Sequence, residues 1–168
     1  MDGQTLTWLY PVVLLGAAIS DILWLRIPNW LSVLLVACFV AYALIAGFGV
    51  DFVAWRLGLG LGILLLGFVV YNFGLLGGGD VKLIAASAVW VGPNELAMFL
   101  LLIALFGGVL AASVFILRKS ILPIPGWLVR QQWFSRLITD GKGIPYGVAI
   151  CAGGIFTFHE ALTALPKV

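Results

Sequence analysis

The sequence predicts an all-α polytopic membrane protein with six transmembrane helices, organised as a single membrane-embedded domain over residues 1–168. Of the 168 residues, 63% are hydrophobic and only 10% are charged, and the mean hydropathy is +1.18. Because a soluble domain is about half apolar and about a quarter charged, this composition indicates an integral protein of the lipid bilayer. The formal net charge of +2 is too small to predict nucleic-acid binding.

Six apolar runs are the predicted spans, because a helix needs about 20 mostly apolar residues to cross a bilayer. They are Leu6–Leu25, Trp30–Phe48, Leu57–Leu76, Val81–Val91, Leu96–Leu117 and Ile144–Leu165. The fourth run is short, and we expect the glycine-rich sequence before it to extend it. No Lys or Arg precedes the first run, which is also too long for a cleavable signal peptide, so it is predicted to be a transmembrane helix.

The basic residues of the loops predict the orientation of the spans. With the N-terminus outside, seven of the nine Lys and Arg residues fall in inner loops. These are Arg26, Lys82, Arg118, Lys119, Arg130, Arg136 and Lys142, against Arg56 and Lys167 on the outer side. This bias predicts an N-out, C-out topology, which requires an even number of spans.

Residues 118–143 form the longest predicted loop, which contains the sequence "GWLVRQQWFSRLITDGKG". Its aromatic and aliphatic residues fall largely on one side of a helix and its polar residues on the other. We therefore predict an amphipathic helix in the cytoplasmic headgroup region. It is either a surface anchor or a segment that receives a substrate.

Two acidic residues, Asp21 and Asp80, lie within or beside the predicted spans, where ionisable side chains are costly and typically functional. Small residues such as Ala17 and Ser20 surround Asp21 and would let another helix approach closely. Asp21 is therefore predicted to face a packed interior or a small aqueous pocket. The alternative is an ordinary interface aspartate that pairs with Arg26.

Asp80 follows three glycines, Gly77, Gly78 and Gly79. An aspartate just before a helix is a good N-cap, but capping does not require the glycines. We expect them to leave a bare approach to the carboxyl group for an extended substrate backbone, or to adopt conformations closed to other residues.

The predicted second and third spans carry the chain out and back, so Asp21 and Asp80 should meet at the cytoplasmic face. Two carboxyl groups in a poorly solvated site cannot both ionise easily and tend to share a proton. One can then deprotonate water while the other polarises a peptide carbonyl, a mechanism that requires no metal and no cofactor. Cys38 and Cys151 lie in separate apolar runs, which predicts two free thiols rather than a metal site.

Three motifs in the chain resemble those of type IV prepilin peptidases, a family of G-x-G-D intramembrane aspartic proteases. "GGGD", Gly77–Asp80, fits G-x-G-D, and "DILWLRIPN", Asp21–Asn29, resembles the motif of the first aspartate. "KGIPYGVAI", Lys142–Ile150, resembles the entry to the last helix. The chain is most similar to the short TadV/CpaA-like form of Flp-pilus systems. The larger enzymes carry a cytoplasmic domain with paired cysteines that this sequence does not show, so methyltransferase activity is not predicted.

The resemblance implies that Asp21 and Asp80 cleave the leader of prepilin or pseudopilin precursors just before their hydrophobic segment. The reaction would take place at the cytoplasmic face of the bacterial inner membrane, in a multi-pass protein. We expect substrate-binding or site-shaping roles for the neighbouring residues Gly77, Gly78, Gly79, Pro28, Asn29, Lys82, Pro145 and Tyr146.

Three alternatives are open at this stage. Presenilin-like proteases share G-x-G-D, but they have a Tyr before the first aspartate, where this chain has Ser20, and a Pro-Ala-Leu motif that it lacks. A proton-coupled small membrane transporter subunit or a secretion-system scaffold could also carry paired acidic residues. The halves of the chain show no repeat symmetry of the kind common in transporters, which favours the peptidase.

Overall fold

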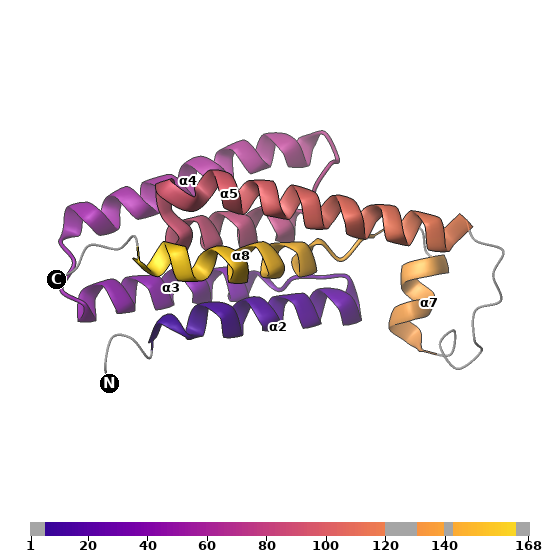
Figure 1. The fold of residues 1–168 in the computed structure, drawn as a ribbon, viewed down its shortest axis with the longest axis horizontal. Helices are drawn as coiled ribbons and strands as arrows, with labels where there is room; N and C mark the ends of the chain where they lie inside the picture. Colours follow the sequence, from indigo (N-terminus) through magenta and orange to yellow (C-terminus); the bar gives the residue numbers. More distant parts are fainter. Residues whose placement is uncertain (1–5, 120–130, 140–142, 164–168) are drawn as a thin grey trace.

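The computed structural model describes residues 6–119, 131–139 and 143–163, and the regular elements within these ranges are helices (Figure 1). They are α2 (Leu9–Trp24), α3 (Asn29–Ile45), α4 (Val50–Asn72), α5 (Gly78–Lys119), α7 (Gln132–Thr139) and α8 (Tyr146–Thr163). The longer helices run alongside one another in a bundle, and the short α7 lies across one end of it (Figure 1).

Most helix bounds agree with the predicted spans within a few residues, but α4 does not. It begins at Val50 rather than Leu57, because Gly49 has an extended conformation that ends the preceding turn. The helix therefore includes Arg56, which we predicted in an outer loop, and it also includes Asp51. By length and composition α4 and α5 can cross a membrane, whereas α2, α3 and the described apolar part of α8 are shorter apolar helices.

Helix α5 contains both the fourth and the fifth predicted spans, joined by a sharp break instead of a loop. At the break Gly92 has φ 76° and ψ 176°, a region of backbone space that is essentially limited to glycine. Pro93 follows and has no backbone N–H to donate. The predicted loop between the two spans is thus reduced to a single turn of the chain.

The two halves of α5 run in opposite directions (Figure 1). The first half is antiparallel to α4, since a Cβ atom on Gly67 would touch Val81 and one on Gly60 would touch Val89. The second half returns beside α8 and ends at Lys119, next to α7 (Figure 1). This reversal brings both ends of α5 to the same side of the break.

Arg56 occupies the space at the break. Its guanidinium is buried and donates hydrogen bonds to the carbonyl oxygens of Val89 at 3.5 Å and Trp90 at 3.4 Å. In a continuous helix the carbonyl of Val89 would bond to the N–H of residue 93, which is a proline. A Cβ atom on Gly92 would collide with the guanidinium. Arg56 is therefore a buried structural residue, and its prediction as an outer-loop residue was wrong.

Trp90 connects three helices inside the bundle. Its indole N–H donates to the carbonyl oxygen of Leu35 at 2.8 Å. Its ring centroid lies 5.4 Å from that of Tyr10, 5.6 Å from Phe39 and 5.8 Å from Tyr42. These contacts pack α2 and α3 against the first half of α5.

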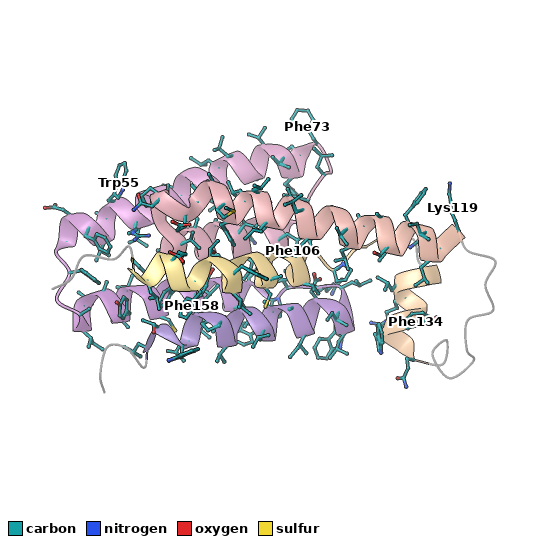
Figure 2. The ribbon with its side chains drawn as sticks, in the orientation of Figure 1. Trp55, Phe73, Phe106, Lys119, Phe134 and Phe158 are labelled. Atoms are coloured by element: carbon teal, nitrogen blue, oxygen red, sulfur yellow. The ribbon has the colours of Figure 1, made fainter. Side chains whose placement is uncertain are left out.

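The outer surface of the bundle is strongly apolar. Large side chains such as Trp55, Phe73 and Val109 are exposed and project away from the helices (Figure 2 labels Trp55 and Phe73). Soluble proteins rarely expose apolar surface on this scale. The surface therefore fits a lipid environment, as the composition predicted.

The amphipathic helix predicted in the longest loop is present as α7. Phe134 on one face is buried, and its ring contacts that of Trp133 edge-on at 5.5 Å. Arg136 on the other face is exposed. Residues 126–130 and 140–142 of the predicted segment lie outside the described residues.

We expect Gly92→Ala to lower the thermal stability of the protein. A side chain in this backbone region costs about 1–3 kcal/mol, and the added Cβ would displace Arg56 from the carbonyl groups that it satisfies. The measurement is the melting temperature of the purified variant in detergent. Gly62→Ala is the matched control, because a Cβ atom there meets no atom within 4 Å. Equal melting of Gly92→Ala and the wild type would contradict this account of the break.

Candidate active site

Asp21 lies in the last turn of α2 and faces the start of α8. Its side chain is 5% exposed, and Oδ2 accepts a hydrogen bond of 2.7 Å from the backbone N–H of Gly147. A Cβ atom on Gly147 would lie only 3.0 Å from Asp21 Oδ2, so the contact depends on the glycine. Within the described residues this amide, and not the exposed Arg26, is the partner of the Asp21 carboxyl.

Asp80 lies in the first turn of α5. The helix begins at Gly78, and Val81 N–H donates to the carbonyl oxygen of Gly77 at 3.1 Å. Asp80 is thus the third helical residue and not the N-cap, which was the alternative interpretation of its place before the predicted span. Its Oδ2 accepts a hydrogen bond from Gly77 N–H at 3.1 Å, which is the carboxylate half of a capping box.

Both carboxyl groups line one open cavity of about 840 Å³. Its walls are the link between α2 and α3, the link between α4 and α5, the entry to α8, and Arg118. The two carboxyl groups are close enough for the charge of Asp21 to act on Asp80. The structure therefore brings together the two aspartates whose meeting was predicted from the helices between them.

The link between α2 and α3 turns sharply just after Asp21. Leu25 has φ 50° and ψ 39°, a left-handed conformation that is uncommon for residues other than glycine, and its N–H donates to Asp21 O at 2.8 Å. Ser20 Oγ donates to the carbonyl oxygen of Arg26 at 2.8 Å. Pro28 is extended and starts α3. Leu25, Arg26 and Pro28 all line the cavity.

Asn29 and Lys82 connect the start of α3 to the start of α5. Lys82 Nζ donates to Asn29 Oδ1 at 2.9 Å. Asn29 lines the cavity, but Lys82 does not. Lys82 lies two residues after Asp80 in α5, so the two side chains point in different directions. Lys82 therefore holds Asn29 at the edge of the cavity rather than acting within it.

The three glycines before Asp80 all line the cavity, and two of them also pack closely against neighbouring atoms. None of them has a positive φ. A Cβ atom on Gly77 would lie 2.7 Å from Asp80 Oδ2, and one on Gly79 would lie 3.2 Å from Ile27 Cβ. The absent side chains let the chain wrap around the Asp80 carboxyl and pack against the link between α2 and α3.

The entry to α8 contributes one residue that the sequence analysis missed. Tyr146, which was predicted, lines the cavity with its ring against Gly107. Pro145 is buried, and its carbonyl oxygen accepts a hydrogen bond from Val148 N–H at 3.1 Å, so it shapes the helix start outside the cavity lining. The missed residue is Gly147, and the available signal was its place directly after Tyr146 in a motif of the last helix.

Arg118 is a second residue of the site that was not predicted. In the sequence it was used only as one of the basic residues of the inner loops. It lines the cavity, and its guanidinium donates to the carbonyl oxygen of Leu137 through Nε at 3.0 Å and Nη2 at 2.7 Å. Nη2 also donates to the carbonyl oxygen of Gly143 at 3.0 Å. Arg118 thus connects the end of α5 to α7 and to the entry of α8, and adds a positive charge to the cavity wall.

The chemistry that the cavity offers is that of two carboxyl groups and water. One carboxylate can accept a proton while a protonated partner donates one. Among the described residues no group of three His, Cys, Asp or Glu side chains could hold a metal ion. Cys38 and Cys151 are free thiols.

Comparison with known proteins identifies the family. The sequence model of the type IV leader peptidase family matches residues 8–112, which is well over half of the chain and includes both aspartates. The chain belongs to the type IV leader peptidase family. The resemblance of the chain to this family is thereby confirmed, and the family indicates a peptidase, which is a hydrolase. No curated protein and no solved structure matches the chain.

We expect Gly147→Ala to lower the leader-peptidase activity by one to two orders of magnitude, since displacing a reacting group by about 1 Å can cost about a hundredfold. The added Cβ would meet Asp21 Cβ and Oδ2 at 3.0 Å and Ile27 at 3.2 Å. The measurement is the rate of leader removal, with the melting temperature as a test of folding. Gly16→Ala is the control, because a Cβ atom at that position of α2 meets nothing within 4 Å. If Gly147→Ala cleaves like Gly16→Ala, the Gly147 amide does not position Asp21.

Proposed function

We propose that this chain is a membrane aspartic endopeptidase that removes the leader from type IV, Flp-like prepilin or pseudopilin precursors. The observation that carries the proposal is the pair of carboxyl groups, Asp21 and Asp80, in one open cavity of a leader-peptidase family member. Each carboxyl accepts a backbone N–H through Oδ2. This leaves Oδ1 of each group for water and the peptide bond.

The proposed reaction needs one proton shared between Asp21 and Asp80. The carboxylate takes a proton from a water molecule, whose oxygen attacks the carbonyl carbon of the leader's last peptide bond. The protonated carboxyl donates its proton to the carbonyl oxygen, which gives a tetrahedral diol. The first carboxyl then gives its proton to the amide nitrogen as the C–N bond breaks. At the same time the second carboxyl, now a carboxylate, takes a proton from one hydroxyl of the diol, so the pair again holds one proton.

The distribution of charge supports a cavity at the cytoplasmic end of the bundle. Five basic residues of the described chain lie at or near the cavity end, namely Arg26, Lys82, Arg118, Lys119 and Arg136. Arg56 lies at the opposite end, buried at the break in α5. With six spans, this bias corresponds to an N-out, C-out protein of the bacterial inner membrane.

We expect Asp21→Asn and Asp80→Asn each to lower the rate of leader removal by about a thousandfold or more, because acid–base catalysis contributes about 10²–10⁴-fold. Asparagine keeps the size of the side chain and can still accept the backbone N–H, but it cannot exchange the proton. The assay follows the loss of the leader from a purified prepilin in detergent. Asp51→Asn, an exposed change in the first turn of α4, is the control. Near-normal cleavage by either variant at Asp21 or Asp80 would refute the two-aspartate mechanism.

The proposed topology predicts which cysteines a membrane-impermeant thiol reagent can reach in intact cells. Phe73 is exposed at the cavity end of α4, and Val50 is exposed at its other end. With Cys38 and Cys151 replaced, Val50→Cys should be labelled from outside, whereas Phe73→Cys should react only after the cells are permeabilised. The reverse pattern would place the cavity on the outer face and overturn the topology.

A further inference from the structure

A second cavity, of about 640 Å³, forms an open groove between α3 and α4 with the first half of α5 as its floor. Helices α3 and α4 both pack against α5 but make little contact with each other. The walls are apolar and include Val33 and Ala37 of α3 and Leu61 and Leu64 of α4. The groove therefore opens from the side of the bundle, on its apolar surface.

The floor of the groove on α5 includes the small residues Ala85 and Ala86, and Val89 lies beside them against Gly60 of α4. In a membrane, helices associate through close packing, and small residues let their backbones approach one another. A flexible lipid chain has no rigid backbone that small residues would bring into close contact. The floor therefore favours a helix as the occupant.

The groove adjoins the catalytic cavity. Asn29 lines both, and Lys82, which lines the groove, donates its hydrogen bond to Asn29 at their boundary. From Asn29 to Ala37 the wall extends over eight residues, or about 12 Å of helix. The groove thus starts beside the two carboxyl groups and leads away from them for about two helical turns.

One polar side chain in the groove wall has no partner within the described part of the chain. Ser32 lies one turn beyond Asn29, is 7% exposed, and its Oγ makes no hydrogen bond there. That oxygen is itself buried, so an occupant of the groove would reach it only if the Ser32 side chain rotated toward the groove. The first turn of any helix has backbone N–H groups without intrahelical acceptors, and such a rotation would give one of them an acceptor.

We infer that this groove binds the apolar segment that follows the cleaved bond of the precursor. The segment lies as a helix parallel to α3, with its first turn beside Asn29 and Ser32, and the bond before it reaches into the cavity of Asp21 and Asp80. The inference rests on the proposed function, since the family resemblance implies cleavage just before a hydrophobic segment.

Photocrosslinking from the groove wall tests the occupant. A benzophenone amino acid replaces Leu61 in the groove or Leu105 on the second half of α5, two leucines that are 57% and 55% exposed and therefore equally open to lipid. The probe is a synthetic precursor with a polar leader and an apolar segment of about 20 residues, reconstituted in liposomes with enzyme that also carries Asp80→Asn. We expect position 61 to crosslink to the apolar segment and position 105 not to. Crosslinks from position 61 only to lipid or to a second copy of the chain, or equal crosslinking from both positions, would overturn the inference.

Cleavage kinetics give an independent readout. Ala37→Phe places a large ring in the groove, and Ala112→Phe places the same ring on the exposed second half of α5. We expect Ala37→Phe to lower kcat/KM for the same precursor by about tenfold or more, mainly through KM, with a melting temperature like that of the control. Ala112→Phe should cleave like the wild type. If the wild type and a folded Ala37→Phe variant both cleave normally, the inference that the groove binds the apolar segment is wrong. If the wild type does not remove the leader, the proposed function is wrong instead.

Discussion

The hydrogen bonds from Arg56 to the end of the first half of α5 allow the chain to reverse inside an apolar bundle. In such surroundings every backbone carbonyl needs a donor, and Pro93 cannot supply one to Val89. Arg56 supplies it from α4, and Gly92 leaves the space for the guanidinium. Because α5 turns back here, its second half can bring Arg118 and the entry to α8 to the end of the bundle where Asp80 lies. A buried charge at one end of the bundle thereby supports the geometry of a site at the other.

At the site itself, the starts of two helices hold the two carboxyl groups. Gly147 is the second residue of α8 and Gly77 directly precedes α5, so both N–H groups belong to the set that lacks acceptors within a helix. Each N–H finds its acceptor in the Oδ2 atom of Asp21 or Asp80. The groups that a helix start leaves unsatisfied are thus the ones that orient the carboxyls. This arrangement couples the position of each aspartate to the backbone rather than to flexible side chains.

The features that depend on local composition were predictable from the sequence, and those that depend on distant contacts were not. The lengths of the apolar runs predicted the helices and the meeting of the two aspartates, and the motifs predicted the family. The burial of Arg56 depends on carbonyl groups 33 and 34 residues away, and the role of Gly147 depends on Asp21, 126 residues away. The packing of the glycines before Asp80 was not predictable either, because a missing side chain is compatible with open space and with close packing. At Gly79, which lies against Ile27, it signals close packing.

In the proposed binding mode, a change from polar to apolar surroundings selects the bond to be cut. The cavity is polar around Asp21 and Asp80, whereas the groove beyond Asn29 is lined almost entirely by apolar side chains. The proposed function implies a matching change in the precursor, whose hydrophobic segment would begin just after the cleaved bond. Sliding the precursor by one helical turn in either direction would place polar groups in the groove or apolar groups in the cavity, and an unpaired polar group in an apolar site costs several kcal/mol, roughly 2–7. Alignment can therefore come from this boundary, with few side-chain contacts to the leader, and a wall built from glycines is sufficient beside the reacting bond.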